Sequence, residues 1–208
     1  DLFTGWGKKC KVQDETEPNW ASSIRISGLD EAEEILDEYK SVIAFQEGVI
    51  AKLKGHYRLL YADGAPLQDA VKNALKVLGL DDVREEKHGL VFDLQHSGYS
   101  LGAILALGSE KRASLDMLKL CRKLADDHSA DGKKAKAVFV ANQQRSSPYP
   151  ESSKERMALD KAEDDFARQE KICIIPAFLL FEAVNKALKG YKPRRLDLEK
   201  LIAETNGI

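Results

Sequence analysis

The chain has 208 residues, 43% of them hydrophobic, with a net charge of −2 at pH 7. This size and apolar content allow one substantial buried core, so we expect one domain with an appendage. The near-balance of charge excludes a strong overall attraction to nucleic acid or to an anionic membrane. Because no apolar run approaches the ~20 residues of a membrane span and no signal peptide is visible, we expect a cytoplasmic protein that does not enter a membrane.

The cysteines and the first residue add two expectations. Cys10, Cys121 and Cys173 lack the spacing of a metal site, and the last two lie within apolar patterns, so we interpret these two as small core residues of a protein from a reducing compartment. Asp1 stands where a complete chain would carry Met, so we expect a fragment of a longer protein.

Three segments are expected in chain order. Residues 1–28 show no clear periodicity and are interpreted as an extended arm, residues 29–62 as a long helix or coiled coil, and residues 63–208 as an α/β domain. In the second segment, positions spaced alternately by four and three form the 3.5-residue repeat of a coiled coil. These positions are Ala32, Leu36, Tyr39, Ile43, Gln46, Ile50, Leu53, Tyr57 and Leu60.

The apolar stripe of this long helix needs a surface to cover it. One hypothesis is that the helix packs on its own domain, and the other is that it forms a dimeric or larger coiled coil. Under the second hypothesis we predict a homodimer whose contacts come from Leu36, Tyr39, Ile43, Ile50 and Leu53.

The remaining chain alternates helices with short apolar strands, which is typical of a sheet with parallel pairs covered on both faces. A helix is predicted after Asp63-Gly64 and closes at Gly79, and a short edge strand is expected near Val83. The further strands are predicted at residues 90–94, 101–109, 137–141 and 172–175, and the further helices at residues 113–126, 155–169, 176–190 and 197–204.

Several motifs within this order resemble a known family. The segment Leu59–Gly79, the strand 137–141 ending at Asn142 before a Pro- and Glu-containing loop, and the strand and helix start at 172–181 are similar to microbial members of the PD-(D/E)xK restriction-endonuclease-like family that carry a preceding coiled coil. The resemblance covers about residues 57–190. It implies a restriction-endonuclease-like mixed sheet flanked by helices.

Active members of that family hydrolyse DNA with Mg²⁺ held by hairpin acids and a water positioned by a lysine. In this chain the resemblance preserves Asp93, but it places Leu105 at the second acid and Leu107 at the lysine. One acid cannot satisfy the octahedral shell of Mg²⁺, so we expect no catalytic residue, no metal and no cofactor. The alternative hypothesis is a Mg²⁺-dependent nuclease with a rearranged site formed by Asp93, Asp69 and Glu110.

Other chemistry is sparse. The four histidines show no zinc spacing, and no phosphate loop or nucleophile elbow is present. Two basic clusters could contact phosphate, and they contain Lys133, Lys134, Lys136, Arg194 and Arg195. The leading interpretation is a catalytically inactive nuclease-like domain that acts as a binding or oligomerisation module, with a protein or nucleic-acid partner left open. A third hypothesis is a recognition domain of a larger protein.

Overall fold

A computed structural model describes residues 20, 24, 26–129, 134–191 and 193–208 of the chain. The protein falls into two compact units, Asp1–Val49 and Ile50–Ile208, which we describe separately. Most of the expected arm at residues 1–28 lies outside the described residues.

The first unit consists, in its described part, mainly of the helix α1, Leu29–Gly55, whose last residues belong to the second unit. At a rise of 1.5 Å per residue this helix is about 40 Å long. Its first turn carries Asp30 and Glu31 and its last turn carries Lys52 and Lys54, as the helix dipole favours. The helix ends at Gly55, not at residue 62 as predicted, and a separate short helix α2, Arg58–Tyr61, follows.

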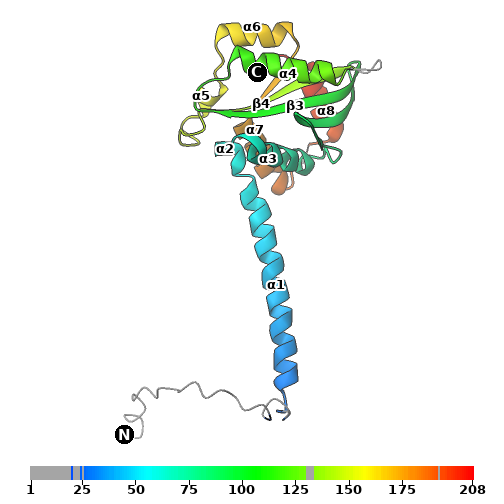
Figure 1. The fold of residues 1–208 in the computed structure, drawn as a ribbon, viewed down its shortest axis with the longest axis vertical. Coiled ribbons are helices and arrows are strands. Elements are labelled where there is room, and N and C mark those ends of the chain that lie inside the picture. The colour runs from blue at the N-terminus through cyan, green and yellow to red at the C-terminus, as the bar shows by residue number, and fades with distance from the viewer. Residues whose placement is uncertain (1–19, 21–23, 25, 130–133, 192) are drawn as a thin grey trace. The chain divides into compact units, whose positions relative to one another are not determined.

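The second unit is built on a mixed five-stranded sheet with the order β1-β2-β3-β4-β5 (Figure 1). The first two pairings are antiparallel and the last two are parallel. The predicted hairpin, edge strand and α/β alternation are therefore confirmed. The strands are β1 Arg84–Glu86, β2 Gly89–His96, β3 Tyr99–Ser109, β4 Ala135–Gln143 and β5 Cys173–Pro176.

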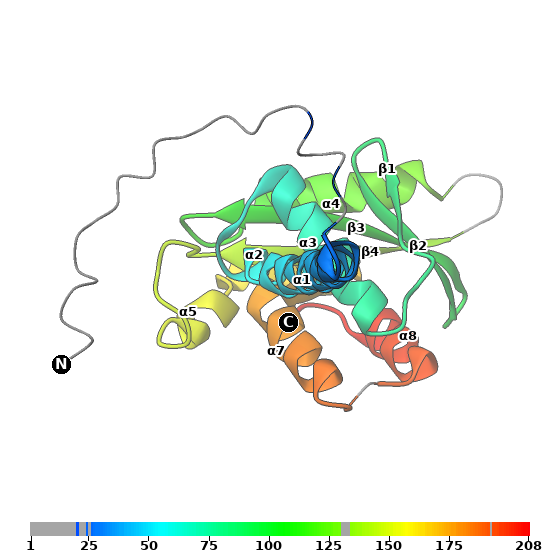
Figure 2. The same cartoon turned by 90° about the horizontal axis from the view of Figure 1, so that it is seen from below.

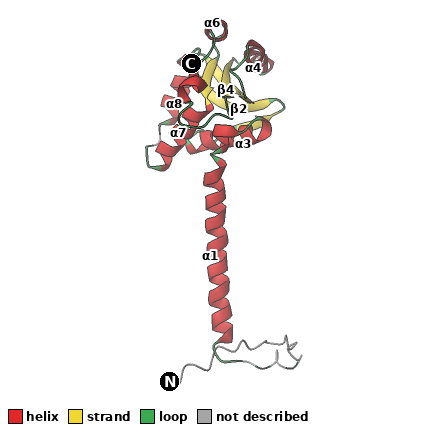
Figure 3. Cartoon of the chain, turned by 90° about the vertical axis from the view of Figure 1, so that its left-hand side faces the viewer, coloured by secondary structure: helices red, strands yellow, loops and turns green. Residues whose placement is uncertain are grey.

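Helices cover both faces of this sheet, as the apolar strands require (Figure 3). On one face α3, α7 and α8 pack on side chains such as Phe92 and Ile104, and on the other face α4 and α6 pack on side chains such as Leu105 and Phe139. Figure 2 shows the first group in front of the sheet and α4 behind it. The helices are α3 Gly64–Val77, α4 Leu115–Asp127, α5 Ser153–Met157, α6 Lys161–Gln169, α7 Ala177–Leu188 and α8 Arg195–Glu204.

Two local results differ from the expected elements. The single helix predicted at residues 155–169 is divided into α5 and α6 by residues 158–160. The outer edge of β5 is partly closed by the carboxyl-terminal residues, because Gly207 exchanges backbone hydrogen bonds with Ile172 and Ile174. The chain end thus blunts an edge that would otherwise expose unpaired backbone groups.

Candidate functional site

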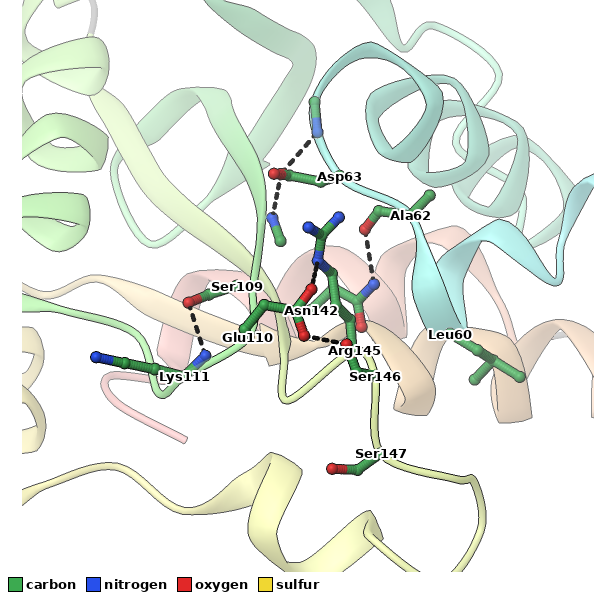
Figure 4. Close-up of polar contacts among 12 residues, drawn as sticks. Leu60, Ala62, Asp63, Ser109, Glu110, Lys111, Asn142, Arg145, Ser146 and Ser147 are labelled. Carbon is green, nitrogen blue, oxygen red and sulfur yellow. Dashed lines mark hydrogen bonds and ion pairs between the residues drawn. The ribbon is translucent and has the colours of Figure 1, made fainter.

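The carboxyl ends of the parallel strands β3 and β4 lie against the turn that begins α3 (Figure 4). One carboxylate oxygen of Asp63 caps this helix, accepting hydrogen bonds from the amides of Gly64 at 2.7 Å and Gly108 at 2.6 Å. A Cβ atom at residue 108 would lie 2.8 Å from the carbonyl oxygen of Ala62, so the approach requires glycine. Asp63 therefore ties the start of α3 to the end of β3.

Arg156 holds the loop after β4 against the same turn. Its side chain is buried, burial lowers its guanidinium pKa, and its five N–H groups all donate hydrogen bonds within the protein. The acceptors are the Ser152 hydroxyl at 2.9 Å, the Asn142 side-chain oxygen at 3.2 Å, and the carbonyl oxygens of Leu60 at 2.8 Å, Ser147 at 2.7 Å and Arg145 at 3.4 Å.

This arrangement leaves Arg156 no donor for a ligand, so the cluster serves to hold the fold. Asn142 completes it by donating to the carbonyl oxygen of Ala62 at 2.8 Å. The neighbouring Gln143 accepts from the amide of Ala113 at 2.8 Å and donates to the carbonyl oxygen of Arg156 at 2.6 Å. The sequence predicted a strand ending at Asn142, but the polar segment around Arg156 carried no signal of its burial.

The three acids of the alternative nuclease hypothesis are not brought together. Asp93 pairs with Leu101 near the start of β3, whereas Glu110 follows the end of β3 at Ser109. The eight residue steps from Leu101 to Ser109 span roughly 26 Å at ~3.3 Å per residue. Asp69 is exposed on α3 and makes no hydrogen bond or ion pair with another described residue.

The carboxylates of Asp93 and Glu110 each have protein partners of their own. Asp93 lies 3.4 Å from the guanidinium of Arg84, and its backbone carbonyl accepts from Arg195 at 3.1 Å. Glu110 accepts hydrogen bonds from the Ser146 hydroxyl and from Arg145 Nε, the latter at 2.7 Å. These two bonds hold the pKa of Glu110 below its ordinary value. The geometry gives no support to a metal site formed by these acids.

The two leucines that replace the expected acid and lysine line a pocket of about 390 Å³. Leu105 is buried, and Ala106 contributes to the core on the opposite face, as expected. Leu107, which the apolar strand at residues 101–109 predicts to be buried as well, is only half-buried because it lies near the end of β3 and faces this pocket. The other lining residues are Gln68, His88, Leu120, Lys123, Leu124 and Asp127.

Four leucines line this pocket together with four polar or charged residues. Asp127 is the one carboxylate among its described lining residues, and Gln68 lines it in place of the neighbouring Asp69. Across the described ranges, no three His, Cys, Asp or Glu side chains cluster as a metal site would require.

The expected basic clusters are divided by the fold. Lys136 is fully buried on β4, and its ammonium donates to the carbonyl oxygen of Thr205 at 2.9 Å and to the Asn206 side chain at 2.8 Å. Burial lowers the pKa of Lys136 to about 8. Our prediction of Lys136 as a phosphate contact is therefore wrong, since the strand is covered on both faces.

The other basic residues have separate surroundings. Lys134 is exposed and lies 4.8 Å from the ring centre of Tyr99, and Lys133 lies outside the described residues. Arg194 pairs with Asp197 at 2.9 Å. Arg195 pairs with Glu199 at 2.5 Å and with Asp82 at 2.8 Å, and these bonds raise its pKa.

The five residues expected to mediate oligomerisation are exposed along α1. Their exposed fractions range from 46% at Leu53 to 64% at Tyr39, and α1 contains no buried residue. The helix thus presents an apolar face that the other described residues of the chain leave largely exposed. Ile35 and Val42, each one residue before a member of this set, are also exposed and widen the apolar face, whereas the exposed Phe45 lies on the other side of the helix.

Comparison of the chain with protein-family models, with curated proteins and with solved structures finds no match. Within the part of the chain that the structure describes, none of the helices combines the length and apolar character of a membrane span.

Proposed function

We propose that this protein is a self-associating scaffold, in which α1 joins two copies of the chain and the α/β unit acts as a catalytically inactive binding module. The observation that carries the proposal is the exposure of Leu36, Tyr39, Ile43, Ile50 and Leu53 on one helix. An isolated apolar surface of this length is a liability on a monomer. Its 3.5-residue spacing is suited to another helix that stays in register over several turns.

A second copy of the same chain is the occupant that the charges favour. The first ten residues of α1, Leu29–Glu38, contain six acidic side chains and no basic one, whereas Tyr39–Gly55 contains three lysines and the single acid Glu47. Two copies can therefore satisfy one another's charge, acidic half against basic half.

We also propose that the α/β unit is a degenerate member of the PD-(D/E)xK restriction-endonuclease-like group. The antiparallel β2-β3 hairpin followed by parallel β4 and β5 supports this assignment at the level of topology. The absence of activity follows from Leu105 and Leu107 and from the length of β3 between Asp93 and Glu110. Without a metal site, the nucleophilic water has nothing to activate it.

The self-association is tested with a pair of matched double variants. Ile43→Asp with Ile50→Asp places two charges in the apolar face, whereas Ala44→Asp with Ala51→Asp places them one residue further along on the outer side. We expect the first variant to sediment as a monomer and the second to retain the wild-type mass. Equal masses for both variants and the wild type would contradict the proposal.

The proposed inactivity is tested by incubating plasmid and single-stranded DNA with the protein in Mg²⁺ and in Mn²⁺. We expect no cleavage above that of buffer alone. Cleavage that disappears in Asp93→Ala or Glu110→Ala would show that a metal-dependent site forms after all.

A further inference from the structure

We infer that the two α1 helices of the dimer run antiparallel, with Leu36 of each copy facing Leu53 of the other. The inference rests on the self-association proposed above and specifies the orientation and register of the second copy. It is built from α1 alone, whose bounds, exposure and charge order are given by the structure and the sequence.

The distribution of charge selects the orientation. In a parallel pair, the acidic segment Leu29–Glu38 would lie beside its own copy, and six carboxylates on each helix would repel six on the other. In an antiparallel pair the same segment lies beside the end of α1 that carries Lys52 and Lys54. The opposed helix dipoles favour the same arrangement.

The heptad pattern then restricts the register. In an antiparallel coiled coil the two kinds of core position alternate across the interface, so Leu36 can face Leu53 or a residue one heptad away. With Leu36 facing Leu53, Tyr39 faces Ile50 and Ile43 faces Gln46, and the symmetry of the pair repeats each contact. All of these side chains are exposed in the single chain and free to pack.

The charged residues beside this core distinguish one register from its neighbours. Glu33, Lys40, Glu47 and Lys54 recur every seven residues on one flank of the stripe. In the inferred register Glu33 lies across from Lys54 of the second copy, and Lys40 across from Glu47, so every pair is of opposite sign. In the single chain Lys40 pairs with Asp37 at 2.8 Å. Because this pair is exposed and weak, Lys40 can exchange it for Glu47 of the second copy.

A shift of one heptad removes this complementarity in either direction. One shift sets Glu33 across from Glu47, and Lys40 across from Lys40 of the second copy. The other shift sets Lys40 across from Lys54, and Glu47 across from Glu47 of the second copy. Exposed pairs contribute little to affinity, but like-charge neighbours penalise a wrong alignment and so fix the register.

Two further residues fit the same register. The two Gln46 side chains lie on adjacent layers, about 4.5 Å apart along the axis. Their amides can therefore hydrogen-bond to one another, which compensates the burial of a polar group in the core. On the other flank Val42 comes beside Val49 of the second copy, and this contact gives the widened apolar stripe a partner.

The register is tested by disulfide trapping in a Cys10→Ser background, where the two remaining cysteines are buried. Leu36→Cys and Leu53→Cys chains carrying different affinity tags are co-expressed, purified through both tags and oxidised. We expect a cross-linked heterodimer, and no cross-link from either variant alone. Residue 36 lies about 25 Å along the axis from its own copy, far outside the ~7 Å reach of a disulfide.

A matched control uses Ile43→Cys with Leu53→Cys, which the neighbouring register would join and the inferred register leaves about 10 Å apart along the axis. A cross-link in this control, or in Leu36→Cys alone, would overturn the inferred register while leaving the dimer intact. A dimeric mass without the expected cross-link would overturn it as well. A monomeric mass for the wild type would instead overturn the self-association on which the inference rests.

Discussion

Replacement of Arg156 by Met removes the side chain that joins α5, the loop after β4 and the turn before α3. Five hydrogen bonds are lost, and the part-buried carbonyl oxygens of Leu60 and Ser147 lose a donor. At a net value of about 1 kcal/mol each, the five bonds set an upper bound of about 5 kcal/mol. The guanidinium no longer has to be desolvated in the variant, so we expect a loss of about 2–4 kcal/mol.

Thermal and urea denaturation at matched protein concentration measure this loss, since self-association makes the midpoint depend on concentration. For a unit of this size the loss corresponds to a fall in Tm of roughly 5–15 °C. Arg156→Lys should recover little of it, because an ammonium cannot reproduce the planar fork of donors. Arg194→Met is the control, because its side chain is 82% exposed, and we expect a change within about 0.5 kcal/mol. An Arg156→Met protein that melts with the wild type would refute the structural role of this cluster.

Three further predictions concern the two leucines of the pocket, Lys136 and Asp82. Leu105→Glu combined with Leu107→Lys introduces the acid and lysine that active PD-(D/E)xK enzymes carry, and should destabilise the fold by several kcal/mol, mainly through residue 105. Melting at the wild-type temperature would mean that the pocket admits water freely. Burial lowers the pKa of Lys136 from 10.5 to about 8, so between these pH values the unfolded chain holds a proton that the folded chain has released. The stability of the wild type relative to Lys136→Met should therefore rise with pH across that window. Urea titrations at about pH 7 and about pH 10 measure this rise, and a constant difference would contradict the buried ammonium. Burial alone would raise the pKa of Asp82, but the amide of Asp93 and the guanidinium of Arg195 hold it below its ordinary value. Asp82→Asn should therefore be less stable than the wild type near neutral pH, and the difference should vanish as the carboxyl becomes protonated in acid. A difference that persists in acid would show another cause.

The sequence predicted the parts of the fold that depend on periodicity. Continuous apolar strands separated by helices specify a sheet covered on both faces, and the run around Leu105 and Ala106 correctly indicated a buried central strand. The 3.5-residue spacing correctly indicated a long helix. The repeat continues to Leu60, but α1 ends at Gly55, a poor helix former, and Leu59 is buried in the separate helix α2.

The contacts of the candidate site depend on strand register and on residues distant in the chain, which the periodicity of the sequence does not indicate. The distance between Asp93 and Glu110 is set by the register of β2 on β3, which pairs Asp93 with Leu101 near the start of the strand. Lys136 was interpreted as a surface charge because its own strand, Ala135–Gln143, gives no sign that the carboxyl-terminal residues will supply acceptors for its ammonium. These are contacts between residues distant in the chain, and a single sequence does not specify them.

Sedimentation equilibrium of the wild-type protein at tens of micromolar tests the central proposal, self-association through α1, most directly. We expect a mass of twice the 23.2 kDa of the chain, falling to that of one chain in the Ile43→Asp, Ile50→Asp variant and unchanged in Ala44→Asp, Ala51→Asp. A single-chain mass for the wild type across this concentration range would contradict it.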